Sequence, residues 1–288
     1  MYAISGITGK VGGAMARALL AAGKPVRAVV RNPDKSGEWL RLGCELAIAD
    51  MGDEAALTKA FSGVEGVFIL PPSNFDPLPG FPEAQAEAAI IRNALQSAKP
   101  DKIVCLSTIG GQVTQSNLLS QRTILEQALS TLSIPLTILR PAWFLDNLVW
   151  DVASAREEGV IHSFLQPADH KFPMISTVDV GHFAAELIQE NWTGRRIVEI
   201  EGPERVSPVD IADAMSEVLS QPVRVETVPR ETWEAMFRAQ GMRNPEPRIQ
   251  MLDGFNEGWI RFENPKSEIL HGTVDVRDII RDLVGRGG

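Results

Sequence analysis

Cysteine is scarce in this sequence, and the pattern around its two cysteines favours neither a disulfide nor a metal site. Cys44 and Cys105 each lie inside or beside an apolar run that is typical of a buried strand. We therefore expect structural thiols in a reducing compartment. Histidine is also rare, and no histidine shows metal-ligand spacing; the four are His162, His170, His182 and His271. The sequence predicts no metal site.

Long apolar runs and an excess of basic residues are missing as well. No apolar stretch approaches membrane-spanning length, and the first expected strand begins at Tyr2, which leaves no room for a signal or transit peptide. We therefore expect a cytoplasmic protein without membrane contact. The 28 Lys and Arg against 37 Asp and Glu give a formal net charge of -9, and the basic residues are dispersed. Direct binding of a nucleic acid is not expected from this balance.

Short apolar runs alternate with helix-length segments up to about Arg140. The runs cover residues 2–5, 26–30, 45–49, 66–70, 103–106 and 136–139. Continuous apolar runs this short are typical of strands in a parallel sheet that is covered on both faces. The sequence therefore predicts an α/β protein with a doubly wound, parallel-sheet Rossmann fold over residues 1–145.

Beyond Arg140 the expected strands become fewer and proline-bounded segments appear. Two more amphipathic helices and two more strands are expected there: helices at 179–189 and 207–219, strands at 198–200 and 223–227. This pattern predicts a smaller C-terminal α/β lobe over residues 146–288 that binds substrate above the open end of the sheet. Some of its segments are expected to return to the Rossmann sheet.

A glycine-rich loop, Ser5-Gly6-Ile7-Thr8-Gly9-Lys10-Val11-Gly12-Gly13, joins the first strand to the first helix. Its first glycine would allow a tight turn, the second would let the backbone approach a pyrophosphate, and the third would let the helix pack closely on the strand. The free N–H groups at a helix start favour an anion. The loop therefore predicts a dinucleotide site, and a tight turn without a ligand is the alternative. The cofactor-binding candidates here are Gly6, Thr8, Gly9, Lys10, Val11 and Gly12.

The end of the second expected strand indicates which dinucleotide binds. NAD-preferring proteins carry an acidic residue there that holds the ribose hydroxyls. This sequence has Arg31, whose guanidinium would pair with a 2′-phosphate, so NADP(H) is favoured over NAD(H). Lys35 is a second candidate, and Asp50 could accept from the adenine amino group. The alternatives are two solvated surface cations and an ordinary turn aspartate.

Four segments together resemble the NmrA-like group of atypical short-chain dehydrogenase/reductases, which includes NADPH-dependent quinone reductases and non-catalytic NADP sensors. The likeness spans about the first 220 residues. It is carried by the glycine loop, by Val29 to Pro33, by Leu139-Arg140-Pro141-Ala142-Trp143-Phe144-Leu145-Asp146-Asn147, and by Ile175 to Val180.

The resemblance implies a set of further site residues. It implies that Pro71, Pro72 and Ser73 pass over the cofactor, that Ser107 and Thr108 face the nicotinamide, and that Pro141 to Phe144 line the other side of the substrate cleft. Each segment begins at the carboxyl end of an expected strand, where open α/β sheets bind ligands. Trp143 and Phe144 would stack a planar acceptor or belong to the core. Asn147 is the third substrate-binding candidate and would cap or fix this turn.

Tyrosine is nearly absent, and this excludes one mechanism. Short-chain dehydrogenases that exchange hydride with alcohols use a Tyr-x-x-x-Lys pair, whereas the single tyrosine, Tyr2, lies in the first strand. Arg122 occupies the place of the lysine but cannot be deprotonated. It would hydrogen-bond a nicotinamide ribose or pair with Glu126 at the i,i+4 spacing. The other weak catalytic candidates are Ser107 and Thr108, which have no histidine nearby in sequence, and His170, in a loop expected near the cleft.

Two functions fit this set of residues. The first is hydride transfer from NAD(P)H to a quinone or a similar planar apolar acceptor, for which solvent supplies the proton. The second is a catalytically inactive NADP(H) sensor that regulates a partner protein. Epimerase chemistry fits poorly because it also depends on the tyrosine. The sequence leaves the acceptor and the oligomeric state open, a homodimer included.

Overall fold

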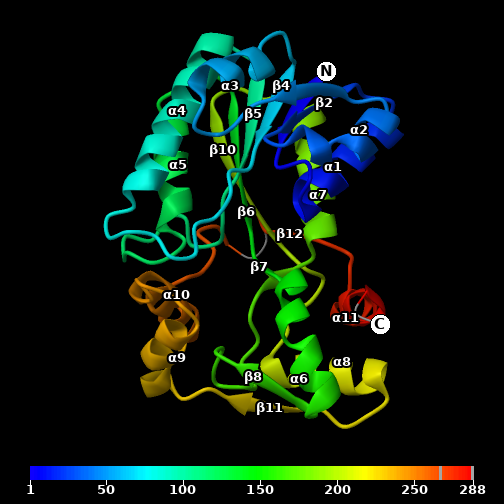
Figure 1. The fold of residues 1–288 in the computed structure, drawn as a ribbon, viewed down its shortest axis with the longest axis vertical. Coiled ribbons are helices and arrows are strands. Elements are labelled where there is room, and N and C mark those ends of the chain that lie inside the picture. Colours follow the sequence, from blue (N-terminus) through cyan, green and yellow to red (C-terminus); the bar gives the residue numbers. More distant parts are fainter. Residues whose placement is uncertain (266–267, 287–288) are drawn as a thin grey trace.

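The computed structural model describes residues 1–265 and 268–286. Its centre is an eight-stranded, parallel sheet with the order β12-β10-β6-β5-β4-β1-β2-β3 (Figure 1). The strands are β1 (Tyr2–Ser5), β2 (Val26–Val30), β3 (Glu45–Ile48), β4 (Gly66–Ile69), β5 (Lys102–Leu106), β6 (Leu136–Pro141), β10 (Arg195–Glu201) and β12 (Leu270–His271). The predicted doubly wound α/β Rossmann fold is confirmed.

Helices cover both faces of this sheet, which is why its strands read as continuous apolar runs. They are α1 (Lys10–Ala21), α2 (Gly37–Arg41), α3 (Glu54–Phe61), α4 (Pro82–Ala98), α5 (Ser120–Leu129) and α7 (Thr177–Gln189). One apolar cluster joins α1 and α7 to the sheet, and a second cluster joins α3, α4 and α5 to it. The central strands β1, β4 and β5 are buried along their whole length.

Glycine lets α1 and α7 pack closely on one face of the sheet. A Cβ atom on Gly181 would lie 2.5 Å from the Cβ atom of Ala14 and 2.8 Å from the carbonyl oxygen of Val11. Helix α7 and strands β10 and β12 come from the chain beyond residue 145 and return to the first sheet. Any division into two lobes is therefore discontinuous in sequence, and the boundary near residue 145 stays a prediction.

The rest of the chain builds a second group of elements below the carboxyl edge of the sheet in Figure 1. It contains β7 (Trp143–Phe144), which pairs with β9 (Met174–Ile175), and β8 (Val160–Ser163), which pairs with β11 (Arg224–Thr227). Its helices are α6 (Val152–Glu157), α8 (Pro208–Leu219), α9 (Trp233–Ala239), α10 (Glu246–Asn256) and α11 (Val276–Arg286), and its 3-10 turns are η2 (Leu145–Trp150) and η3 (Arg230–Thr232). The 3-10 turn η1 (Pro33–Lys35) follows β2.

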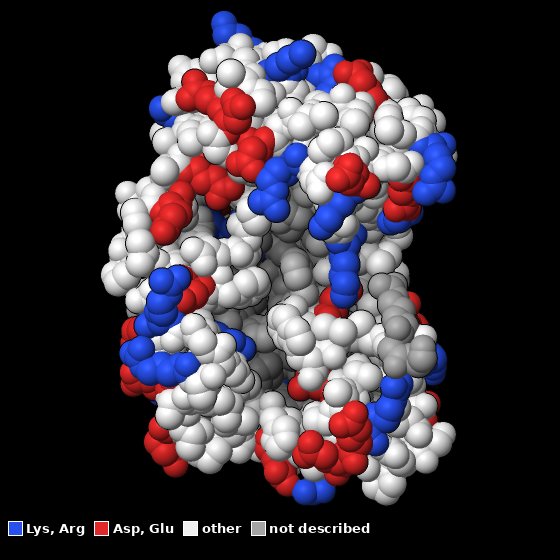
Figure 2. Space-filling model, viewed as in Figure 1, with Lys and Arg blue, Asp and Glu red and all other residues white. Residues whose placement is uncertain are grey.

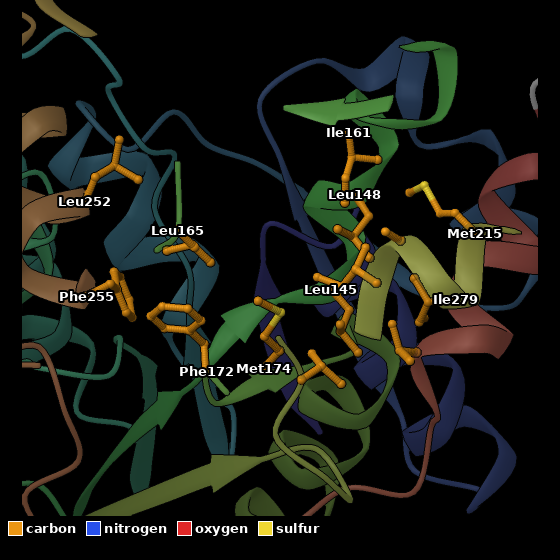
Figure 3. Close-up of a cluster of buried hydrophobic side chains, with 14 of the residues drawn as sticks. Leu145, Leu148, Ile161, Leu165, Phe172, Met174, Met215, Leu252, Phe255 and Ile279 are labelled. Atoms are coloured by element: carbon orange, nitrogen blue, oxygen red, sulfur yellow. The ribbon is translucent and has the colours of Figure 1, made fainter. Parts of the chain in front are cut away.

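A large apolar cluster holds this second group together. Figure 3 shows Leu145 and Leu148 facing Met215 and Ile279, with Phe172 beside Phe255. The buried rings of Trp233 and Phe237 belong to the same cluster. Within the described ranges, no helix is both long enough and apolar enough to cross a lipid bilayer.

Asp151, directly before α6, gives the fold an expected pH dependence. Burial raises the pKa of its carboxyl from 3.8 to about 6. The folded protein therefore holds a proton that the unfolded chain has already lost, so the free energy of unfolding should fall as the pH rises from about 4 to about 6. Asp151→Asn should stabilise the protein by about 2 kcal/mol at pH 8 and by little at pH 4. Urea unfolding at both pH values measures this, with the exposed Asp101→Asn as the control. An equal gain at both pH values would contradict the assignment.

Candidate active site

Six loops meet at one edge of the sheet because all six strands before them are parallel. They follow β3, β2, β1, β4, β5 and β6 in this spatial order. The strand order reverses between β1 and β4, and open α/β sheets bind ligands at such a reversal, beyond the carboxyl ends of the strands. Figure 2 shows a hollow in the molecular surface between the sheet and the second group of elements. The loops that carry most of the sequence-predicted residues therefore lie at this one edge of the sheet.

The glycine loop has the geometry of an anion cradle. Gly6 has a φ of +65°, and the Gly9 N–H donates to the Gly6 carbonyl over 2.9 Å. A Cβ atom on Gly12 would lie 2.4 Å from the Gly6 oxygen, so helix and turn approach as closely as backbones can. Gly9 is exposed and serves as the N-cap of α1 without any side-chain cap. The first N–H groups of α1 thus remain available to a ligand.

Lys10, exposed at the start of α1, joins this loop to the second half of the chain. Its Nζ atom lies 3.0 Å from Oδ1 of Asp146, and Oδ2 of Asp146 accepts from the Thr177 N–H over 2.8 Å at the start of α7. Thr8 is exposed beside Lys10, and Val11 is buried under the loop. Sequence reasoning missed Asp146 as a site residue, although it lies in the stretch that carries the family resemblance.

Arg31 lies at the carboxyl end of β2, and its side chain is 79% exposed. Its Nε atom lies 4.0 Å from Oδ2 of Asp50 after β3, a loose surface pair. Asp50 also accepts from the Gly52 N–H over 2.9 Å, as a turn residue does. Lys35 is exposed at the end of η1. The Arg31 guanidinium is thus free to leave Asp50 for a stronger anion.

Arg122, on α5, holds the loop that follows β4. Its Nη2 atom donates to the Pro71 carbonyl over 2.9 Å and to the Ser73 hydroxyl over 2.7 Å. Burial lowers the pKa of this guanidinium, and burial raises the pKa of the neighbouring Glu87. The expected alternative, a pair with Glu126 four residues later, is wrong because Glu126 turns to Arg140. Arg122 therefore positions Pro71, Pro72 and Ser73 at the cleft.

Ser107, at the end of β5, donates its hydroxyl to Oε1 of Glu126. The Arg140 guanidinium forks onto the same carboxylate, with 2.9 Å from Nε to Oε1 and 2.7 Å from Nη2 to Oε2. Burial alone would lower the pKa of Arg140, but Glu126 and Glu263 outweigh it and raise the pKa. The sequence pattern does not reveal the buried Glu126–Arg140 pair, since the i,i+4 spacing from Arg122 indicates a helix-surface position for Glu126 and Arg140 stands out only as part of a motif.

The aromatic residues after β6 point toward different parts of the molecule. Trp143 packs edge-on against Phe255 with ring centroids 5.0 Å apart, and Phe144 packs against the cluster of α1 and α7. Both are partly exposed, as is Asn147, whereas Pro141 is buried. His170 is exposed and packs edge-on against Phe172 at 4.7 Å, and its backbone N–H bonds to the Pro167 carbonyl.

Two other observations bear on proton transfer. The hydroxyl of Tyr2 donates to Glu65 over 2.7 Å at the opposite end of the sheet, and burial and Glu65 raise its pKa to about 12. Thr108 is partly exposed beside Ser107, and its carbonyl accepts from the Gly111 N–H. The tyrosine is thus remote from the cleft, and the hydroxyl at the end of β5 is bonded to a carboxylate.

The fold and this cleft define a class of protein. Residues 2–255 match the model of the NmrA-like family, and the chain belongs to that family. Quinone oxidoreductase 2 of Escherichia coli (strain K12) is 26% identical over 258 residues, 88% of this chain and 85% of the relative. The NAD(P)H azoreductase of Xenophilus azovorans is 27% identical over 259 residues, 89% of this chain and 85% of the relative.

Solved structures agree on the fold. The NADPH-dependent quinone oxidoreductase of Escherichia coli, solved with NADPH, superposes with a TM-score of 0.82 at 24% identity and covers 98% of this chain and 99% of its own. The triphenylmethane reductase of Citrobacter sp., solved with NADP(H), has a TM-score of 0.80 at 20% identity with the same two coverages. The expected resemblance to this family is confirmed.

Proposed function

We propose that this protein is an NADPH-dependent oxidoreductase that transfers hydride to a quinone or a similar planar, apolar acceptor. The observation that carries the proposal is the carboxyl edge of the sheet. There, the exposed Arg31 after β2, the uncapped start of α1 after β1 and the loops after β4, β5 and β6 follow one another in the order that the parts of a bound dinucleotide require. The names of the relatives, a quinone reductase and an azoreductase, support the same acceptor class.

The residues at this edge fit a dinucleotide. Gly12 leaves no room for a side chain between helix and turn, while the ideal Cβ position of Gly9 meets only the Gly6 oxygen, at 3.2 Å, so its other side is open. The α1 N–H groups and Lys10 would hold the pyrophosphate. Arg31, with Lys35 behind it, would hold a 2′-phosphate, and the loops after β4, β5 and β6 would hold the nicotinamide half.

When bound, NADPH supplies the hydride. The residues of the chain would position the nicotinamide and offer an apolar surface to the acceptor. Arg122 fixes the Pro71–Ser73 loop at the edge of the cleft through two hydrogen bonds. Trp143, which packs edge-on against Phe255, would offer a flat apolar surface to the acceptor. The sequence contains one tyrosine, and that tyrosine is remote. An acceptor that takes hydride through its own electron affinity, with its proton from solvent, suits such a cleft.

A panel of acceptors tests the proposal. Purified protein should oxidise NADPH, followed at 340 nm, with small quinones and azo dyes but not with simple aldehydes, which need an acid to protonate the alkoxide. Trp143→Ala should raise the KM for quinones more than it changes the Kd for NADPH. Turnover of aldehydes alone would contradict the proposed acceptor class.

Arg31 should set the preference for NADPH over NADH. Arg31→Ala removes the charge-assisted bonds to the 2′-phosphate, and we expect the Kd for NADPH to rise roughly 10- to 50-fold while the Kd for NADH stays within about twofold. Nucleotide fluorescence titration measures both. The exposed Arg41→Ala on α2 is the matched control and should change neither value. An equal loss for both nucleotides would place Arg31 elsewhere than at the 2′-phosphate.

A nucleotide sensor is the second candidate, favoured by the remote position of the tyrosine. It predicts tight binding, no turnover with any acceptor, and unequal affinities for NADP+ and NADPH in calorimetry. In that case, the surface around the cleft would bind a regulatory protein or a second copy of the chain.

A further inference from the structure

Ser107 occupies the central position of the proposed nicotinamide half of the site. It directly follows β5, which lies between β4 and β6, and its backbone N–H donates to the Leu139 carbonyl over 2.8 Å. The residue is 6% exposed, so it is almost fully buried at the carboxyl end of β5. At such a position, the direction in which a hydroxyl donates decides what it can bind.

The partner of the hydroxyl is an ionised carboxylate. Glu126 and Arg140 are both buried, at 6% and 3% exposure, and their bidentate contact is the geometry of a guanidinium on a carboxylate. The guanidinium keeps its charge at all relevant pH values. Glu126 therefore accepts hydrogen bonds and has no proton to donate.

The surrounding loop closes this pair off from water. A Cβ atom on Gly111 would lie 2.5 Å from Oε1 of Glu126 and 2.6 Å from Nε of Arg140. On the far side, Nη1 of Arg140 donates to Oε2 of Glu263 over 2.7 Å. Protein atoms thus surround the Glu126–Arg140 pair, and Glu126 is the acceptor of the Ser107 hydroxyl.

A serine hydroxyl has one proton and two lone pairs. Because the Ser107 hydroxyl donates its hydrogen bond to Glu126, only the lone pairs of its oxygen remain for a ligand. A catalytic serine acting as an acid would have to donate a proton or a hydrogen bond to the carbonyl of the substrate. Ser107 is therefore unsuited to that role. It is suited to accept from an N–H group.

We propose that Ser107 accepts a hydrogen bond from the amino group of the nicotinamide carboxamide, and that the Glu126–Arg140 pair fixes it in this acceptor role. This inference rests on the proposed nucleotide site. The carboxamide then binds with its amino group toward β5, which orients the ring in the cleft. Ser107 is a binding residue, and Glu126 and Arg140 are positioning residues behind it.

Three oxidised nucleotides that differ only at the 3-substituent of the ring test the proposal by binding alone. These are NADP+, its 3-acetylpyridine analogue, in which a methyl group replaces the amino group, and its nicotinic acid analogue, in which a carboxylate replaces the amide. The wild-type protein should bind NADP+ roughly 5- to 10-fold more tightly than the acetyl analogue, because one neutral hydrogen bond is lost. The carboxylate analogue should bind most weakly, since it meets lone pairs and a buried carboxylate.

Ser107→Ala should bring the Kd values of NADP+ and the acetyl analogue within about twofold while the carboxylate analogue stays weakest, because Glu126 remains. Ser62→Ala, at the end of α3, is the matched control and should keep the wild-type ratio. Equal binding of the amide and acetyl nucleotides by the wild-type protein would overturn the inference, and so would an unchanged ratio in Ser107→Ala. Failure of all three nucleotides to bind would instead contradict the proposed function.

Discussion

Gly12→Ala should destabilise the protein by about 2–3 kcal/mol and weaken NADPH binding by about 100-fold or more. The added Cβ atom would lie 2.4 Å from the Gly6 oxygen, 2.7 Å from the Gly6 carbonyl carbon and 2.9 Å from the Ile7 Cα atom. All three are backbone atoms, so no side chain can move aside. The start of α1 must shift away from the turn, and the N–H groups that face the pyrophosphate move with it.

Gly37→Ala is the matched control for this change. Gly37 opens α2, a Cβ atom there meets nothing within 4 Å, and its φ lies outside the left-handed region. Alanine should stabilise this exposed helix start by up to about 1 kcal/mol and leave the Kd for NADPH unchanged. Thermal unfolding and fluorescence titration measure both variants. If Gly12→Ala bound NADPH as the wild-type protein does, the loop would be a structural turn without a ligand.

Arg140→Met should lower the free energy of unfolding by about 3–5 kcal/mol. The change removes the fork on Glu126, the 2.7 Å bond to Glu263, and a cation 3.9 Å from the fully buried Glu199. Glu199 keeps the backbone N–H groups of Glu263 and Asn264, at 2.9 and 2.8 Å. Among the residues that the structure describes, Glu126 would keep only the Ser107 hydroxyl, and an unpaired buried charge is the main source of the expected loss.

A second change separates a buried charge from a loss of packing. Adding Glu126→Leu to Arg140→Met should restore most of the lost stability, since replacing both partners of a buried ion pair by apolar residues is often close to neutral. Arg224→Met, which breaks an exposed pair with Glu226, is the control and should change stability by less than about 1 kcal/mol. If the double variant were less stable than Arg140→Met alone, unpaired charge would not explain the loss.

The parallel sheet could be predicted from the sequence because its strands are buried on both faces and leave continuous apolar runs. The glycine loop could be predicted for a similar local reason, since a turn, a close approach and a helix start follow one another within eight residues. The observed φ of Gly6 and the contact at Gly12 match these expectations.

The partners of the polar side chains could not be predicted in this way, because they depend on how distant segments meet. Glu126 lies four residues after Arg122, and this spacing suggested a helix-surface pair. In the folded protein, Glu126 on α5 instead contacts Arg140 on strand β6, and Arg122 contacts the loop after β4. Similarly, the pairing of Asp146 with Lys10 joins residues 136 positions apart in the chain, which no local pattern encodes.

Anaerobic consumption of NADPH with a simple quinone tests the central claim most directly. We expect one NADPH to be oxidised for each quinone reduced, at a rate proportional to protein concentration and slower with NADH than with NADPH. Binding of NADPH without oxidation in the presence of quinones and azo dyes would contradict the reductase and leave the nucleotide sensor in its place.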